Sequence, residues 1–258
     1  MSSTAPKLYL LDIEGTVAPV TLTTEVLFPY ARKHFETFLR EGLVLEMENL
    51  KPGDSPDGMI MLDVAGLMQE NQAETDPEVP SILPLAGVSM SPAYAIPRML
   101  AYVYWLMDRD RKSTALKSLQ GKIWKAGFES GELKGILFDD VPGAFGLWAR
   151  DGRVAIYSSG SVEAQELLFR YSNFGDLTPL ISGYFDTRIG AKRQGDSYGA
   201  IAEAMKVAPG EVLFFSDVAA ELDAARVAGC GTRLVVREGN APVADGNGHE
   251  RIESLENL

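Results

Sequence analysis

Residues 7–19, KLYLLDIEGTVAP, decide how the rest of the sequence is interpreted. Residues 8–11 are apolar without alternation, which indicates a strand buried on both faces, and Gly15 and Thr16 mark its break into a loop. Asp12 and Glu14 are therefore expected at the carboxyl end of a strand, where open α/β sheets bind their ligands. Two solvated acids at a strand end would give the same pattern, so this window alone leaves both interpretations open.

The composition limits the class of protein and of partner. The chain has 258 residues, of which 46% are hydrophobic and 23% charged, as is usual for a soluble globular protein of one or two domains. A formal net charge of -12 argues against a nucleic acid or an anionic membrane as partner, because both require clustered Lys and Arg. A small anionic substrate remains compatible with this charge if cations gather locally.

The scarcity of cysteine and histidine directs the chemistry to other groups. The single cysteine, Cys230, precludes an internal disulfide framework, and the sequence shows neither a signal-like N-terminus nor an apolar run of membrane-spanning length. The cytoplasm is the expected location, with the nucleus also open if the source is a eukaryote. His34 and His249 are the two histidines, which disfavours a His-rich zinc site and a Ser-His-Asp triad. Carboxylates, hydroxyls and lysine are left as the chemical groups.

A helical block is predicted over residues 22–133. Apolar side chains recur at helical spacing over four segments, namely residues 24–40, 59–69, 93–111 and 113–128. Pro29 is expected to interrupt the first helix near its start, and His34 on that helix is expected to pack or to face solvent. Loops are expected at residues 51–57 and in the acidic, proline-rich residues 71–92.

From residue 136 onward, short apolar segments alternate with helical ones, which predicts a parallel sheet covered by helices. Strands are expected at residues 136–138, 153–157, around 184–185, 212–215 and 232–236. Helices are expected at residues 144–150, 162–171, 197–205 and 219–228. The strand at 232–236 is expected to be the last, followed by a tail that packs on the surface through Ile252 and Leu255.

Polar side chains follow three of these strands. Asp12 and Glu14 follow the first, Ser158 and Ser159 another, and Asp217 a third. Because the carboxyl ends of parallel strands meet at one edge of the sheet, these residues are expected to share one pocket.

Two turns carry further candidates. The turn at residues 158–161 opens a helix whose N-terminal amides can hold phosphate; Ser161 is expected to cap that helix, and Ser158 and Ser159 to face the ligand. Asp139 and Asp140 are expected to cap and solvate a turn, with catalysis as the alternative.

The charges of these residues suggest a reaction. Asp12 and Asp217 cannot lie together as bare anions without a raised pKa for one of them, and a hard cation with oxygen ligands and water would resolve this, which favours Mg²⁺. Lys192, in the loop GAKRQGD, can supply positive charge to a phosphate. A carboxylate nucleophile can form an aspartyl-phosphate without histidine, and a second acid two residues on can protonate the leaving oxygen and then activate water.

These residues resemble those of the haloacid-dehalogenase-like phosphatases, whose nucleophile follows the first strand. More narrowly, the chain is similar to the enolase-phosphatases, or acireductone synthases, of methionine salvage. The matching strings span nearly the whole chain: DIEGT, VLFPYAR, LQGKIWKAGF, GELKG, YSSGSVEAQELLF, GDLTPLISGYFDT, SDVAAELDAAR and VVREGN.

The resemblance implies a doubly wound core, residues 1–21 and 134–258, with an inserted helical cap, residues 22–133. It implies that 2,3-diketo-5-methylthiopentyl 1-phosphate is enolised and dephosphorylated to the acireductone 1,2-dihydroxy-3-keto-5-methylthiopentene, by a monomer with one Mg²⁺ per chain. Asp12 matches the nucleophile. The metal positions are matched by Asp12, Glu14 and Asp217, and the substrate-phosphate positions by Ser158, Ser159 and Lys192.

Departures from the family pattern are small. Val17-Ala18 stands where hydroxyl residues are common, which removes no ligand, and FDDVP replaces a more usual aromatic-Pro-Asp version. Glu14 stands where most of the superfamily has Asp, and its duty as proton donor, carboxylate ligand or backbone ligand stays open. The alternatives are a Mg²⁺-dependent phosphatase of another small phosphorylated metabolite and a non-catalytic binding protein, which the presence of Asp12 and Lys192 disfavours.

Overall fold

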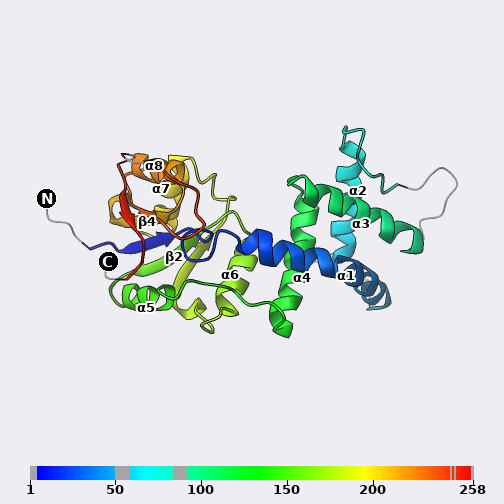
Figure 1. Cartoon of the computed structure of the whole chain (residues 1–258), viewed down its shortest axis with the longest axis horizontal. Coiled ribbons are helices and arrows are strands. Elements are labelled where there is room, and N and C mark those ends of the chain that lie inside the picture. Colours follow the sequence, from blue (N-terminus) through cyan, green and yellow to red (C-terminus); the bar gives the residue numbers. More distant parts are fainter. Residues whose placement is uncertain (1–4, 50–58, 84–91, 245, 247, 257–258) are drawn as a thin grey trace. The chain divides into compact units, whose positions relative to one another are not determined.

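The computed structural model describes residues 5–49, 59–83, 92–244, 246 and 248–256, and the chain divides into two compact units (Figure 1). One unit consists of Met1–Glu25 and Gly127–Leu258, the other of Val26–Ala126. The loop expected at residues 51–57 lies outside the described residues. Among those described, no helix is long and apolar enough to cross a membrane.

A parallel sheet of six strands forms the first unit, as the sequence predicts. The strands are β1 (Leu8–Leu11), β2 (Arg153–Tyr157), β3 (Ile181–Phe185), β4 (Val212–Ser216), β5 (Gly231–Val235) and β6 (Glu250–Ile252). Their order is β3-β2-β1-β4-β5-β6, so β1 is central and Leu11 pairs with Ile156 on one side and Phe215 on the other. The strand order runs outward from β1 on both of its sides, β2 and β3 on one side and β4 to β6 on the other. Such a reversal of strand order creates a crevice at the carboxyl ends of β1, β2 and β4.

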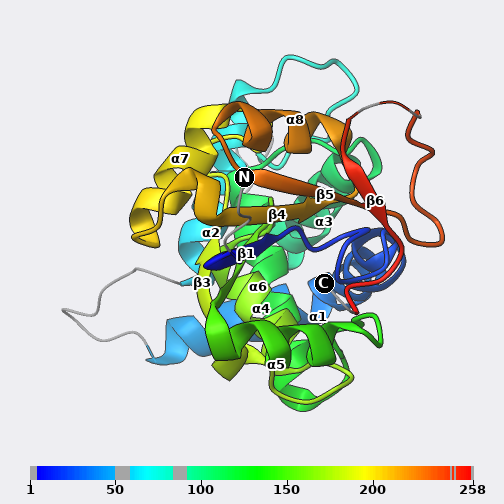
Figure 2. The ribbon, with the colours of Figure 1, turned by 90° about the vertical axis from the view of Figure 1, so that its left-hand side faces the viewer.

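Helices cover both faces of the sheet (Figure 2). On one face lie α7 (Gly195–Ala204) and α8 (Ala219–Val227), which pack on each other, with α8 against β4 and β5. On the other lie α5 (Val141–Asp151), against β2, and α6 (Val162–Arg170), against β3, and these two helices meet through Phe145 and Phe169. Short 3₁₀ turns, η2 (Thr178–Leu180) and η3 (Pro209–Glu211), precede β3 and β4.

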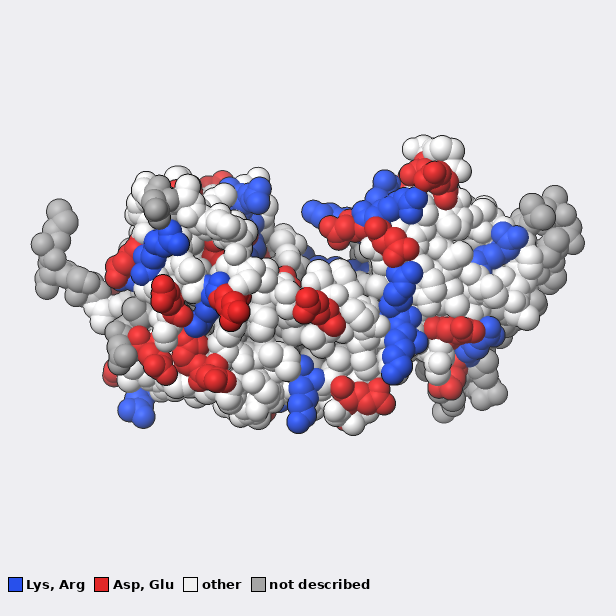
Figure 3. Space-filling model, viewed as in Figure 1, with Lys and Arg blue, Asp and Glu red and all other residues white. Residues whose placement is uncertain are grey.

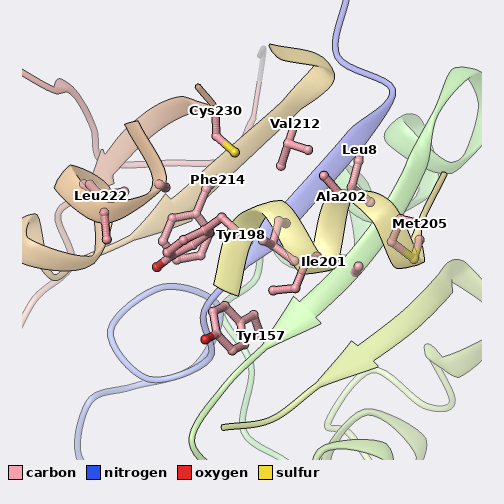
Figure 4. Packing of buried hydrophobic residues seen from close by; sticks show 14 of the residues in the cluster. Leu8, Tyr157, Tyr198, Ile201, Ala202, Met205, Val212, Phe214, Leu222 and Cys230 are labelled. Atoms are coloured by element: carbon pink, nitrogen blue, oxygen red, sulfur yellow. The ribbon is translucent and has the colours of Figure 1, made fainter. Parts of the chain in front are cut away.

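The core explains why residues 8–11 do not alternate in polarity. Leu8 and Leu10 belong to a buried cluster with Phe214 and with Tyr198 of α7 (Figure 4). The ring centroids of Phe214 and Tyr198 lie 5.0 Å apart. Tyr9, which points to the opposite face, stacks on Trp148 of α5 at 4.5 Å. Both faces of β1 therefore meet apolar helices.

Two expectations about strands were wrong. Residues 136–138 form no strand; Gly135 makes an isolated bridge to Ser172, and the Asn173 side chain takes the place of a neighbouring strand by bonding to both the amide and the carbonyl of Leu137. The strand at Gly231–Val235 is not the last, because β6 pairs with it inside the supposed tail. Its short polar sequence, ERI, carries no strand signal of its own, whereas Leu255 is buried as expected of an anchor.

The second unit is built from helices. They are α1 (Phe28–Asn49), α2 (Ile60–Ala73), α3 (Pro92–Asp108) and α4 (Thr114–Ser130). A π-helical turn, η1 (Leu22–Leu27), leads into α1, so Pro29 lies in the first turn of α1, where a missing amide hydrogen does no harm. The acidic segment after α2 is held by buried Asn71, which bonds to the backbone of Pro80 and Ile82.

A buried ion pair joins distant parts of the sheet unit. Arg237 lies 2.8 Å from Asp140 Oδ2, and each side chain is 9% exposed. Asp140 also accepts hydrogen bonds from the Leu255 amide and the Ser254 hydroxyl, and Arg237 donates to the carbonyl of Thr16, behind Asp12. The carboxylate of Asp140 therefore has a structural role, because it links Arg237 to the C-terminal segment.

Asp140→Ala is expected to lower the free energy of unfolding by about 3–5 kcal/mol, because it leaves a buried guanidinium without its carboxylate. Urea denaturation measures this loss. The control is Glu250→Gln, which breaks the ion pair between Arg233 and Glu250. Because the Glu250 side chain is 64% exposed, this substitution should change the free energy of unfolding by less than about 1 kcal/mol. Equal, small losses in both variants would contradict the structural role of Asp140.

Candidate active site

The crevice at the strand ends holds a pocket of about 250 Å³. All six site residues expected from the sequence line it. The complete lining is Asp12, Glu14, Val20, Ser158, Ser159, Lys192, Asp217, Val218 and Glu221. Segments far apart in the sequence thus meet because β1, β2 and β4 are neighbours.

Asp12 is fixed at the end of β1 from several sides. Its amide donates to the Phe215 carbonyl on β4, and its Oδ1 accepts the Ile13 amide at 2.8 Å. Its Oδ2 lies 2.6 Å from Lys192 Nζ. The residue is 6% exposed, so this carboxylate is a well-oriented group with a cation beside it.

Lys192 bridges two carboxylates. Its Nζ lies 2.7 Å from Glu221 Oε2 as well as beside Asp12, and its side chain is 10% exposed. Burial acts to lower the pKa of Lys192, but the two carboxylates outweigh burial and the pKa is raised. Lys192 is therefore a cation at neutral pH.

Glu221 was missed by the sequence analysis. It lies in the first turn of α8, four residues after Asp217, and Ser216 Oγ donates to its Oε2 at 3.1 Å. Burial and then the charge of Asp12 raise the pKa of Glu221, while Lys192 acts against them. The string SDVAAE carries no helical-period signal for it, because Asp217 lies before α8 begins and the two acids do not share a helix face.

Three hydroxyls hold the loop that carries Lys192. They bind consecutive carbonyls: Tyr157 donates to Gly190 at 2.8 Å, Ser197 to Ala191 at 2.8 Å, and Tyr198 to Lys192 at 2.6 Å. Burial raises the pKa of both tyrosines, which keeps them protonated as donors. The backbone that carries the Lys192 ammonium group is thus held in place.

The loop after β1 is tight. Gly15 has φ +70°, and its amide donates to the Ala18 carbonyl at 2.8 Å. A Cβ on Gly15 would overlap Asp217 Oδ2, so glycine is needed both for its backbone angle and for the approach of Asp217. Glu14 faces the pocket, and its Oε1 accepts the Thr23 amide at 3.2 Å.

Asp12 and Asp217 suit a hard cation. Burial and then the charge of Asp12 raise the pKa of Asp217 to about 6, so a cation between the two carboxylates would relieve their repulsion. Among the described residues, no three carboxylate, imidazole or thiol side chains converge on one point. Mg²⁺ fits such a set, because it is usually bound by one or two carboxylates and completes its shell with water and phosphate oxygens.

The serine turn after β2 is braced from behind. Ser161 caps α6 by accepting the Ala164 amide, as the sequence predicts. Gln165, which the sequence analysis did not single out, donates to the carbonyls of Gly160 and Phe185. Ser158 and Ser159 line the pocket beside the N-terminus of α6, a position suited to an anion.

Comparisons with known proteins agree on one family. A model of the haloacid dehalogenase-like hydrolases matches residues 6–229. Enolase-phosphatase E1 of Synechococcus elongatus is 49% identical over 92% of both chains, and that of Leptospira borgpetersenii is 40% identical over 98% of both. Enolase-phosphatase E1 of Drosophila grimshawi is 39% identical over 95% of this chain and 92% of its own.

Solved structures show the same fold. The UTR4 protein of Saccharomyces cerevisiae has a TM-score of 0.73 and 33% identity, covering 98% of this chain and 100% of its own. CbbY of Rhodobacter sphaeroides in complex with phosphate, at a TM-score of 0.52 and 16% identity over 98% and 96% of the two chains, is similar in fold alone.

Gly15→Ala is expected to destabilise the protein more than Gly131→Ala. Gly131 has φ +79° with open space at its Cβ position, so alanine there meets only the backbone strain, about 1–2 kcal/mol. Alanine at residue 15 meets the same strain and also displaces Asp217. Urea denaturation compares the variants, and equal losses would contradict the packing of Gly15 against Asp217.

Asp217 should make stability depend on pH in the presence of a chelator. Because its pKa is raised from 3.8 to about 6 on folding, its contribution is full below pH 3.8 and is lost as the pH rises through 6. The advantage of Asp217→Asn over the wild type in free energy of unfolding should therefore grow from pH 4 to pH 7, as measured by urea denaturation in EDTA. An advantage that stays constant or shrinks would refute the raised pKa.

Proposed function

Because the chain belongs to the enolase-phosphatases, within the haloacid dehalogenase-like hydrolases, we propose that it converts 2,3-diketo-5-methylthiopentyl 1-phosphate to the acireductone and phosphate in methionine salvage. The chain is a phosphatase; its substrate, metal and covalent intermediate are the proposed parts. The observation that supports them best is the gathering of all six expected polar residues around one pocket.

The phosphoryl step uses Asp12 and Glu14. After enolisation, an oxygen of Asp12 bonds to phosphorus as the ester P–O bond breaks, and Glu14 gives its proton to the leaving oxygen. Glu14 then takes a proton from water, whose oxygen bonds to phosphorus and displaces Asp12. This leaves phosphate, free Asp12 and protonated Glu14. The contact of Asp12 with the Ile13 amide favours one fixed orientation of the attacking group.

Ser158, Ser159 and Lys192 would hold the phosphate. The serine hydroxyls and the N-terminus of α6 offer donors, and Lys192 offers a charge. Lys192 already contacts Asp12, so it lies where negative charge approaches the nucleophile.

One Mg²⁺ would be held by Asp12 and Asp217, with Glu14 as the third position. Since Glu14 Oε1 already accepts the Thr23 amide, we assign the Glu14 carboxylate to proton transfer and its backbone carbonyl to the metal. When bound, the ion would offset the charges of the carboxylates and the phosphate.

The helical unit is proposed to select the substrate. Val26–Ala126 interrupts the sheet unit in sequence, and we assign it the part of a cap that recognises the methylthio end. We further propose a cytoplasmic monomer without nucleic-acid or membrane partners. The absence of a nucleic-acid or membrane partner is supported by the basic and acidic side chains interspersed on the face shown in Figure 3, because such partners require clustered Lys and Arg.

Incubation with the diketo phosphate and Mg²⁺ tests this function. Both phosphate release and enediol absorbance are expected, and neither would appear if the proposal were wrong. A panel of other phosphorylated metabolites distinguishes the runner-up, since faster turnover of one of them would assign the chain to a different substrate.

Substitutions separate the two acids. Asp12→Asn should abolish phosphate release, whereas Glu14→Gln should reduce it by about 10²–10⁴-fold by removing general acid and base catalysis. Steady-state phosphate assays measure both. The control is Asp139→Asn, an exposed carboxylate outside the pocket lining, which should leave the rate unchanged. Full activity of Asp12→Asn would rule out the covalent step.

A further inference from the structure

Asn240, in the turn after β5, has a side chain whose orientation is fixed. Its Nδ2 donates to the Gly15 carbonyl at 2.9 Å and to the Val235 carbonyl at 3.4 Å. Since both partners can only accept, the nitrogen of the amide must face them. The oxygen, Oδ1, therefore points the other way.

That oxygen has no partner among the described residues, although it is shielded from solvent. A Cβ on Gly15 would come within 2.9 Å of Asn240 Oδ1 and would also overlap Asp217 Oδ2. Two acceptors thus lie on the same side of Gly15, beside the cation site. A buried acceptor without a donor is rare and costly, so a donor is expected here.

The nearby cations of the chain are already engaged. Lys192 is held between Asp12 and Glu221, and Arg237 donates to the Thr16 carbonyl and to Asp140. A water molecule bound to a metal ion is a strong donor, and it would lie within reach of a ligand such as Asp217.

We propose that Asn240 is a positioning residue, whose Oδ1 accepts a hydrogen bond from a water molecule of the metal ion assigned to Asp12 and Asp217. This inference depends on the metal site of the proposed function. The same amide holds the carbonyl of Gly15, so it ties the loop that carries Glu14 to the water shell of the ion.

Mn²⁺ binding without substrate tests the inference, with free Mn²⁺ measured by electron paramagnetic resonance. Asn240→Ala should weaken the Kd about tenfold or more, as is usual when a partner of a metal's ligands is removed. Asn240→Asp keeps an oxygen acceptor toward the ion but loses the donor to the Gly15 and Val235 carbonyls, so it should bind Mn²⁺ more tightly than Asn240→Ala. An affinity no better than that of Asn240→Ala would overturn the role of the acceptor. The control is Asn173→Ala, since the Asn173 side chain likewise bonds to backbone groups, those of Leu137, and it should leave the Kd unchanged.

The outcomes are distinct. Equal affinity of Asn240→Ala and wild type would overturn the role of Asn240 and leave the metal site intact. No Mn²⁺ binding by the wild type would overturn the metal site and this inference together. If Asn240→Ala fails to fold, as judged by thermal unfolding, Asn240→Ser decides: it removes the acceptor at the Oδ1 position, so a Kd equal to that of the wild type would overturn the inference.

Discussion

The site depends on one ammonium group held between two buried carboxylates. Lys192 contacts both Asp12 and Glu221, and Asp217 adds a third carboxylate whose pKa is raised. One cation cannot offset three acids, and excess buried negative charge is costly unless it is paired. The pocket is therefore prepared for further positive charge before a phosphate enters. This explains why an acidic protein, with a net charge of -12, can be built to handle an anionic substrate.

The fold supplies this arrangement through rigid supports. β1 lies between β2 and β4, so Asp12 meets groups that lie more than 140 residues away in the sequence. Three hydroxyls, one on β2 and two on α7, fix the loop that carries Lys192, and Gly15 allows Asp217 to come close. Arg237 and Asn240 hold the carbonyls of Thr16 and Gly15 from the segment after β5. The loop that carries Glu14 is thus braced by residues outside the pocket lining.

Local patterns in the sequence were enough for most elements and for six pocket residues. The apolar run before Asp12 does not alternate in polarity, which predicts a strand buried on both faces. The serine turn predicts a helix N-terminus. Sequence patterns failed where a tertiary contact decides the structure. Residues 136–138 are apolar but form no strand, because Leu137 bonds to the side chain of Asn173, and β6 is polar yet completes the sheet edge. Glu221 and Asn240 act through partners fixed only by folding, so their residue types alone carry no such signal.

Asp12 is the residue proposed to receive the phosphoryl group. Wild-type protein turning over the diketo phosphate with Mg²⁺ can be quenched rapidly in acid, digested and mapped by tandem mass spectrometry. One phosphoryl group is expected on the peptide that contains Asp12, at Asp12 itself, and none in Asp12→Asn. Rapid turnover with no phosphoryl group on Asp12 at any quench time, together with active Asp12→Asn, would contradict this role of Asp12.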